Sequence, residues 1–375
     1  MWYHRRKDIS LFVLKKNKGS ADSSLKSANL LESSLFKVFT FFFAVGLGLS
    51  WLIPQPAISQ AKPKDVELTL VSFSVTKSAY ERIIPRFVAK WKRENNNQNV
   101  SFNQSYGGSG SQTRAVIDGL EADVVHLSLA LDTDRIQQAG LIQAGWEREV
   151  PNSGIVSKSV VALVARPGNP KKIQGWADLA KPGIKVITAN PKTSGVARWN
   201  FLGLWGSVTK NGGNEQAART FVGKVYKNVP VLPKDAREAS DVFYKQNQGD
   251  VLINYENEVL LAKQKGEAEP FIIPQVNISI DNPVAVVDKY AAKHGTTKVA
   301  EAFVKYLFTP EAQQEFAKVG FRPANSTVAG QFSSQFPRIG KLFTVSDMGG
   351  WKGAQSKFFA DGTIFDQIQN GLGNR

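Results

Sequence analysis

One junction recurs along this sequence: an apolar run with the pattern of a strand stops at small polar residues, and a run with helical spacing begins at once. Alternation of strands and helices predicts an α/β fold. If the strands are parallel, the junctions meet at the carboxyl edges of the sheets, where open α/β sheets bind ligands. The junctions stand at Ser74, at Ser109, at Ser194 with Gly195, and at Asp235 with Ala236.

The junction at residues 190–200 is the most informative. An apolar run at 184–189 stops at an Asn-Pro pair, and Ser194 and Gly195 then precede a helical pattern that extends to about residue 207. The first amides of a helix lack intrahelical partners and the macrodipole adds partial positive charge, so this arrangement suits an anion. For one junction alone, a serine that merely caps the helix is the simpler interpretation. Junctions that face one cleft together favour an anion site.

The first sixty residues have the pattern of an export signal. A basic stretch at 1–37 precedes an apolar run at 38–53, and Ser59 and Ala61 place small residues at the positions that signal peptidases recognise. We therefore expect residues 1–61 to be a signal peptide that is cleaved after Ala61, and the folded part to be periplasmic. An uncleaved anchor is the alternative, but the apolar run is shorter than the roughly 20 residues that span a bilayer.

The exported part is long enough for two lobes. We expect residues 62–160 to form the first part of lobe 1, residues 161–276 to form lobe 2, residues 277–330 to return to lobe 1, and the tail at 331–375 to pack against the fold, since it is rich in Phe and Trp. Among the predicted strands are a third strand at 123–131 and a strand at 229–232.

Little in the sequence suggests an enzyme. Cysteine is absent, which excludes disulfides and thiolate metal sites, and the three histidines stand far apart, so we expect neither a metal nor a cofactor. The stretch 107–111 misses the nucleophile-elbow pattern, and no Walker A motif is present. Glu256 and Glu258 have the spacing of a solvated face. The net charge of +15 is scattered rather than clustered, which argues against nucleic acid. An exported hydrolase with Ser109 or Ser194 as nucleophile stays open, although no general base is visible.

The same residues carry a family resemblance. The segments 104–110, 119–123, 190–206, 249–258 and 343–365, with the core Ala197-Arg198-Trp199-Asn200, resemble the periplasmic sulfate-binding proteins of ABC importers. The resemblance spans nearly all of residues 66–370. It implies a type II, two-lobe, hinge-bending fold with an anion cleft between the lobes, no catalysis, and a monomer that delivers its cargo to a membrane permease with a cytoplasmic ATPase. Thiosulfate, molybdate or phosphate are alternative cargoes for the same fold.

The resemblance also implies the binding residues. In that family, backbone amides, a serine hydroxyl and an indole N–H hold a dehydrated sulfate that no positively charged side chain touches. The corresponding amides here are those of Ser74, Ser109, Gly195, Val196 and Ala236, the hydroxyl is that of Ser194, and the ring donor is Tyr255. Arg198 is expected to stay off the ligand.

Three positions depart from the family pattern. Ser74 stands where Asp is common, Val196 replaces a second glycine, and Tyr255 replaces tryptophan. An indole only donates, whereas a phenol donates or accepts. A site made only of donors rejects a protonated phosphate because its O–H finds no acceptor. We therefore expect Tyr255 to relax the discrimination against phosphate and related oxyanions.

Overall fold

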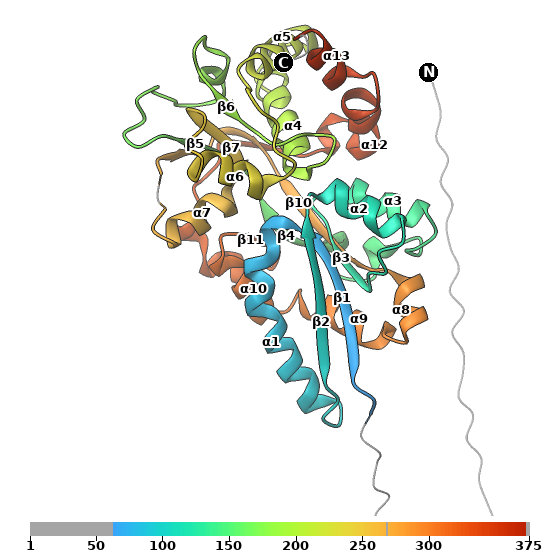
Figure 1. The fold of residues 1–375 in the computed structure, drawn as a ribbon. Helices are drawn as coiled ribbons and strands as arrows, with labels where there is room; N and C mark the ends of the chain where they lie inside the picture. The colour runs from blue at the N-terminus through green and yellow to red at the C-terminus, as the bar shows by residue number, and fades with distance from the viewer. Residues whose placement is uncertain (1–62, 268, 373–375) are drawn as a thin grey trace, which may run out of the picture. The chain divides into compact units, whose positions relative to one another are not determined.

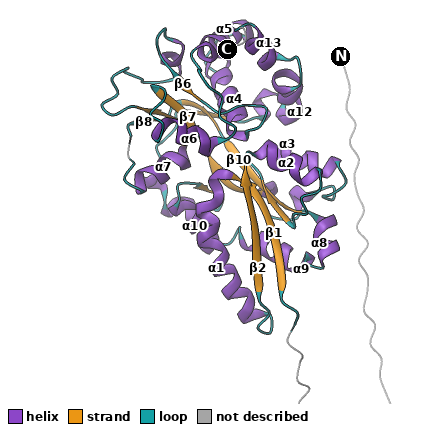
Figure 2. Ribbon diagram, viewed as in Figure 1, coloured by secondary structure: helices purple, strands orange, loops and turns teal. Residues whose placement is uncertain are grey.

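The computed structural model describes residues 63–267 and 269–372. These residues belong to one compact unit, Ala61–Arg375, and the expected signal peptide at 1–61 lies outside the described part. Helices and strands alternate through most of it (Figure 2). Within the described residues, every helix is too short or too polar to cross a membrane.

The first sheet has six strands in the order β11-β4-β10-β3-β1-β2. Strand β1 runs parallel to β2 and β3, whereas β10 and β4 run antiparallel to their neighbours. Its strands are β1 (Val66–Phe73), β2 (Val100–Gly107), β3 (Val124–His126), β4 (Ile155–Ser159), β10 (Ile280–Val286) and β11 (Arg322–Pro323).

Helices cover both faces of this sheet (Figure 1). Successive strand residues point to opposite faces, so Leu70 packs in one cluster with α1, α9 and α10, and Val71 packs in the other with α2 and α3. Burial on both faces explains why Leu70, Val71 and Phe73, three of the last four residues of β1, are apolar. The helices of this half are α1 (Lys77–Glu94), α2 (Ser109–Ile117), α3 (Ala130–Gln138), α8 (Asp288–His294), α9 (Thr297–Tyr306), α10 (Pro310–Lys318) and α11 (Ser326–Gln331).

The second sheet has four strands in the order β6-β7-β5-β8, and every residue of β5 and β7 is buried. Its strands are β5 (Val161–Ala165), β6 (Val186–Ile187), β7 (Val251–Tyr255) and β8 (Phe271–Ile272), and its helices are α4 (Gly195–Thr209), α5 (Glu215–Lys227), α6 (Ala236–Tyr244) and α7 (Glu256–Gln264).

The C-terminal segment packs on this second half. Its strand β12 (Lys341–Phe343) pairs with β9 (Val276–Ile278), and its helices are α12 (Gly350–Ala354) and α13 (Ile364–Asn370). The rings of Trp199 and Trp351 meet with their centroids 4.6 Å apart. Helix α4 is buried from Gly195 through Gly206 because the second sheet covers one side of it and this segment covers another.

The chain passes between the two halves where β4 leads into β5, where β9 leads into β10, and again between α11 and β12. The side chain of Asn277 links the first two crossings, since it accepts from Val161 N and donates to Val161 O. A bend at these crossings leaves both sheets intact. The exact lobe boundaries remain predictions.

Two strand predictions need correction. The expected strand at 123–131 narrows to β3, because the amide of Ser128 donates to Ser109 Oγ at 3.0 Å instead of to a neighbouring strand, and α3 starts at Ala130. The expected strand at 229–232 does not form. Pro230 has no N–H to donate, and the amide of Val229 donates to Tyr226 O at the end of α5.

Candidate anion-binding site

Helix α4 begins with donors that the protein itself does not use. Ser194 is the N-cap residue and only 3% exposed, yet its hydroxyl makes no capping bond and has no hydrogen-bond partner among the described residues. The amides of Gly195 and Val196 likewise meet no acceptor in the described part of the chain. The side chain of Val196 packs in the core, so its branched Cβ does not obstruct its amide. This helix start offers one hydroxyl and two amides to a ligand.

The start of helix α2 lies against this helix start. A Cβ placed on Gly108 would lie 2.6 Å from Thr193 O, and one placed on Gly195 would lie 2.4 Å from both Cβ and Oγ of Ser128 and 3.2 Å from Cβ of Ser109. Glycine is required at both positions because neighbouring atoms already fill the space. The first half therefore reaches the N-terminus of α4 through Ser109 and Ser128.

The start of helix α6 lies beside the start of helix α4. Thr193 Oγ1 donates to Lys234 O at 2.7 Å, and Asn190 N donates to Pro233 O, so the loops that precede α4 and α6 are bonded to each other. Asp235 Oδ1 accepts from the amides of residues 237 and 238 and thereby caps α6. The amide of Ala236, which is 3% exposed, has no acceptor among the described residues.

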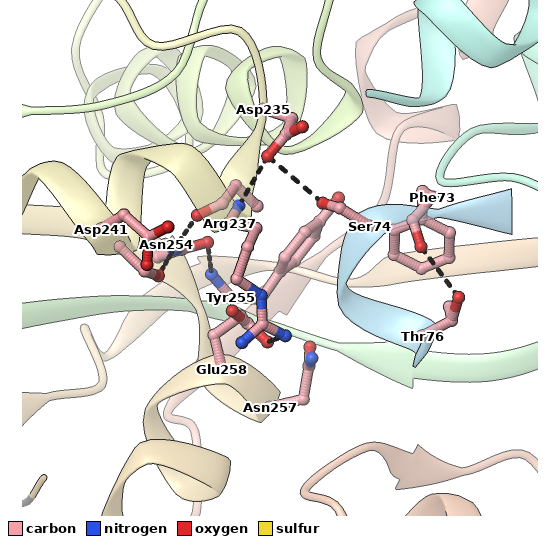
Figure 3. A network of polar contacts seen from close by, with 12 residues as sticks. Phe73, Ser74, Thr76, Asp235, Arg237, Asp241, Asn254, Tyr255, Asn257 and Glu258 are labelled. Atoms are coloured by element: carbon pink, nitrogen blue, oxygen red, sulfur yellow. Dashed lines mark hydrogen bonds and ion pairs between the residues drawn. The ribbon is translucent and has the colours of Figure 1, made fainter. Parts of the chain in front are cut away.

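Ser74 approaches from the end of β1. Its hydroxyl donates to Asp235 Oδ1 at 3.4 Å, a contact that joins the two halves of the molecule (Figure 3). The Asp235 carboxylate is thus engaged by helix amides and by this hydroxyl. Ser74 lies at the outer edge of the site, because it also lines an open groove of about 740 Å³ together with Lys77 and Arg237.

Tyr255 closes the site from the end of β7. It is 1% exposed, and its hydroxyl lies 2.6 Å from Ser128 Oγ. Burial raises the pKa of Tyr255 above its ordinary value, against the opposing effect of the Ser128 hydrogen bond. The phenol therefore stays protonated and neutral. The Phe73 ring supports it edge-on, with the ring centroids 6.0 Å apart.

Two neighbouring side chains have partners that keep them away from a ligand. Ser109 Oγ donates to Asp132 Oδ2 at 2.6 Å and accepts from Ser128 N, which leaves only its amide for binding. Arg198 is 5% exposed; its Nε donates to Pro191 O at 2.9 Å, and its Nη1 lies 3.5 Å from Asp132 Oδ1. The nearby guanidinium is thus neutralised by a carboxylate, and the donors left over are neutral.

The structure brings the sequence-predicted residues together and adds Ser128, which was not among them. Contacts link the segments that carry Ser74, Ser109, Ser194, Gly195, Val196, Ala236 and Tyr255. Ser128 was missed because it falls inside a run that was predicted to be strand. The signal was present, since a small polar residue interrupts that apolar run.

The expectation of a solvated face at Glu256 and Glu258 was wrong. Both lie in the first turn of α7, where Glu256 is 0% exposed and Glu258 is 6% exposed. Arg322 binds Glu256 through two hydrogen bonds of 2.6 and 2.9 Å, and Arg237 Nη2 lies 3.1 Å from Glu258 Oε1. Burial raises the pKa of Glu258 to about 7, because one partly exposed guanidinium does not offset the lost hydration.

Nucleophilic catalysis finds no support at this site. Among the described residues, the two histidines are engaged elsewhere: His126 with Tyr80 and Ser157, and His294 with carboxylates. The described part of the chain also lacks any group of three His, Cys, Asp or Glu that could hold a metal ion. The arrangement can hold an anion by hydrogen bonds, and neither histidine of the described residues contacts Ser109 or Ser194.

Comparisons with known proteins agree with this geometry. A family described as "Bacterial extracellular solute-binding protein" matches residues 68–322. The sulfate-binding protein of Synechocystis sp. (strain ATCC 27184 / PCC 6803 / Kazusa) is 60% identical over 316 residues, which cover 84% of this chain and 90% of that protein. The thiosulfate-binding protein of Pseudomonas aeruginosa (strain PAO1) is 39% identical over 301 residues, or 80% of this chain and 90% of that protein.

A solved structure supports the same conclusion. The sulfate-binding protein SubI from Mycobacterium tuberculosis H37Rv matches with a TM-score of 0.73 and 38% identity, over 79% of this chain and all of that one. The expected α/β, type II periplasmic binding protein fold is confirmed, and the relatives are named as binding proteins rather than enzymes. The chain belongs to the bacterial extracellular solute-binding proteins.

Proposed function

We propose that this protein captures sulfate outside the cytoplasm and delivers it to the membrane permease of an ABC importer. The observation that carries the proposal is the start of α4, where a buried Ser194 hydroxyl and the amides of Gly195 and Val196 have no protein partner among the described residues. The names of the relatives supply the cargo. We further propose that residues 1–61 are removed on export and that the mature protein acts as a periplasmic monomer.

Neutral donors suffice to hold a dianion here. Each helix N-terminus carries about half a positive charge and points its free amides outward. Three such starts, at α2, α4 and α6, are linked by contacts around residues 193–195. A hydrogen bond to a charged group contributes about 1.5–3 kcal/mol, so five amides, the Ser194 hydroxyl and the one free hydroxyl hydrogen of the Ser128–Tyr255 pair offset a large part of the anion's lost hydration.

Binding is coupled to closure because the donors come from both halves of the molecule. Ser74 and Ser109 belong to the half built on the first sheet, whereas Ser194, Ala236 and Tyr255 belong to the half built on the second. An anion that touches both sets stabilises the closed form relative to an open one. The bend would take place at the two strand crossings, β4 to β5 and β9 to β10.

Calorimetric titration of the protein with sulfate, thiosulfate, molybdate and phosphate tests this function. Sulfate should bind at one site per chain. Ser194→Ala should weaken sulfate binding by roughly 10- to 150-fold, because it removes one hydrogen bond to a charged ligand. Ser207→Ala is the matched control, since Ser207 Oγ donates only to Leu204 O near the end of α4.

Two results would overturn the proposal. One is the absence of sulfate binding while another of the four anions binds. The other is hydrolysis of an ester substrate that Ser194→Ala or Ser109→Ala abolishes, which would make the protein the exported hydrolase instead.

A further inference from the structure

Ser128 takes part in four hydrogen bonds at the cleft, although no local sequence pattern pointed to it. Its amide donates to Ser109 Oγ, and its carbonyl accepts from Trp199 Nε1 at 3.0 Å and from Asn282 Nδ2 at 3.1 Å. Its hydroxyl lies 2.6 Å from the hydroxyl of Tyr255. These bonds fix the residue between β3, α4 and β10 and hold its side chain against Gly195 at the start of α4.

The hydroxyl groups of Ser128 and Tyr255 carry one hydrogen each. Ser128 is 0% exposed and Tyr255 is 1% exposed, and neither side-chain oxygen has another hydrogen-bond partner among the described residues. One of the two hydrogens lies between the oxygens. The other points away from the pair, and the protein offers no acceptor for it in the described part of the chain.

The direction of the shared hydrogen bond follows from acidity. A phenol is a far stronger acid than an aliphatic alcohol, so Tyr255 is the better donor and Ser128 the better acceptor. When Tyr255 donates to Ser128, the Ser128 hydrogen is free to reach an anion at the start of α4. The phenol oxygen then has only lone pairs left, and toward a ligand it acts as an acceptor.

We propose that Ser128 is a specificity-determining residue of this cleft: it ties up the Tyr255 hydrogen, so that the pair presents one donor and one acceptor to the bound anion. The proposal rests on the anion-binding function proposed above. Sulfate needs only the donor. A singly protonated tetrahedral oxyanion, such as hydrogen phosphate, uses both, because its own O–H donates to the phenol oxygen. The cleft therefore takes both classes of anion, and Ser128 is the reason.

The test measures the ratio of sulfate to phosphate affinity by calorimetry at pH 8, where phosphate is mainly the singly protonated dianion. In Ser128→Ala the freed Tyr255 hydrogen turns toward the ligand and converts the phenol from an acceptor into a donor. Sulfate affinity should change by less than about tenfold, and phosphate affinity should fall much further, so that the ratio rises by at least about tenfold. Tyr255→Phe removes the acceptor outright and should raise the ratio in the same direction.

Two control variants each remove a hydroxyl group at a position outside the proposed binding site. Tyr226→Phe deletes the hydroxyl of a tyrosine on α5 that is 1% exposed and whose oxygen has no hydrogen-bond partner among the described residues, and Ser207→Ala deletes a hydroxyl near the end of α4. Both should leave the ratio unchanged. Thermal unfolding of each ligand-free variant checks that it folds.

The possible outcomes distinguish a failure of the proposed sulfate-binding function from a failure of the proposed role of Ser128. If the wild-type protein does not bind sulfate, the proposed function fails. If the wild type binds sulfate but Ser128→Ala weakens both anions by the same factor, or leaves both unchanged, the function stands and the role of Ser128 is wrong. A ratio that rises in Ser128→Ala and in Tyr255→Phe, but not in the controls, supports the proposal.

Discussion

A single methyl group added at Gly195 tests whether the closed cleft is as tight as the structure shows. In Gly195→Ala the new Cβ would lie 2.4 Å from Cβ and Oγ of Ser128, closer than nonbonded carbon atoms approach. Ser128 belongs to the half built on the first sheet and Gly195 to the other half. The clash therefore arises only when the halves close, and the folding of each half is spared.

The size of the effect follows from the cost of overpacking. Forcing one extra methyl group into a filled site costs about 1–3 kcal/mol. If that cost falls on the closed form alone, the apparent sulfate affinity drops by roughly 5- to 150-fold. The thermal stability of the ligand-free protein should change little. Calorimetric titration and ligand-free thermal unfolding measure the two quantities separately.

A compensating variant and a matched control sharpen this test. Ser128→Gly removes the two atoms that lie 2.4 Å from the new methyl group, so Gly195→Ala combined with Ser128→Gly should bind sulfate more tightly than Gly195→Ala alone. Gly223→Ala places a methyl group on α5, where no atom of the described residues outside the local helix lies within 4 Å of the new Cβ, and should leave the affinity unchanged. Wild-type affinity in Gly195→Ala, or no recovery in the double variant, would refute the closed geometry.

Three further predictions concern stability. Burial raises the pKa of Glu258 from 4.5 to about 7, so the free energy of unfolding of the wild type should fall as the pH rises from 4.5 to 7. Glu258→Gln should reduce the difference in unfolding free energy between pH 5 and pH 8, measured by denaturant titration. His294 donates hydrogen bonds to the carboxylates of Asp123 and Glu121, and these bonds raise the pKa of His294. The stability that they contribute is complete below about pH 6.5 and is lost as the pH rises through the raised pKa, and His294→Gln should remove that dependence. Lys192 Nζ lies 2.9 Å from Asp366 and 3.2 Å from Asp361, and Lys192→Met should lower the free energy of unfolding by about 1 kcal/mol, measured by urea denaturation.

Local patterns predicted the parts of the fold that local chemistry decides. The helix starts at Ser109, Gly195 and Ala236 are confirmed, since a strand that stops at small polar residues leaves the next amides free to begin a helix. The fully buried strands β5 and β7 coincide with mainly apolar runs, because burial on both faces favours apolar residues.

The features that were missed depend on contacts between distant segments. Glu256 and Glu258 have the spacing of a solvated pair, and only the approach of Arg322 and Arg237 makes their burial tolerable. Ser128 interrupts an apolar run, but its importance comes from Tyr255, which lies 127 positions further along the chain. No local pattern encodes such a pair. The expected strand at 229–232 does not form although the run is apolar, because Pro230 has no N–H to donate and the Val229 amide donates to Tyr226 O.

The most direct test of the central claim is to locate the anion itself. Selenate has the shape and charge of sulfate, and its selenium gives an anomalous signal in a crystal of the protein. We expect one selenium peak at the start of α4, with selenate oxygens within about 3 Å of Ser194 Oγ and of the Gly195 amide, and without a Lys or Arg side chain in contact. A peak elsewhere, or an anion held by the Arg198 guanidinium, would contradict it.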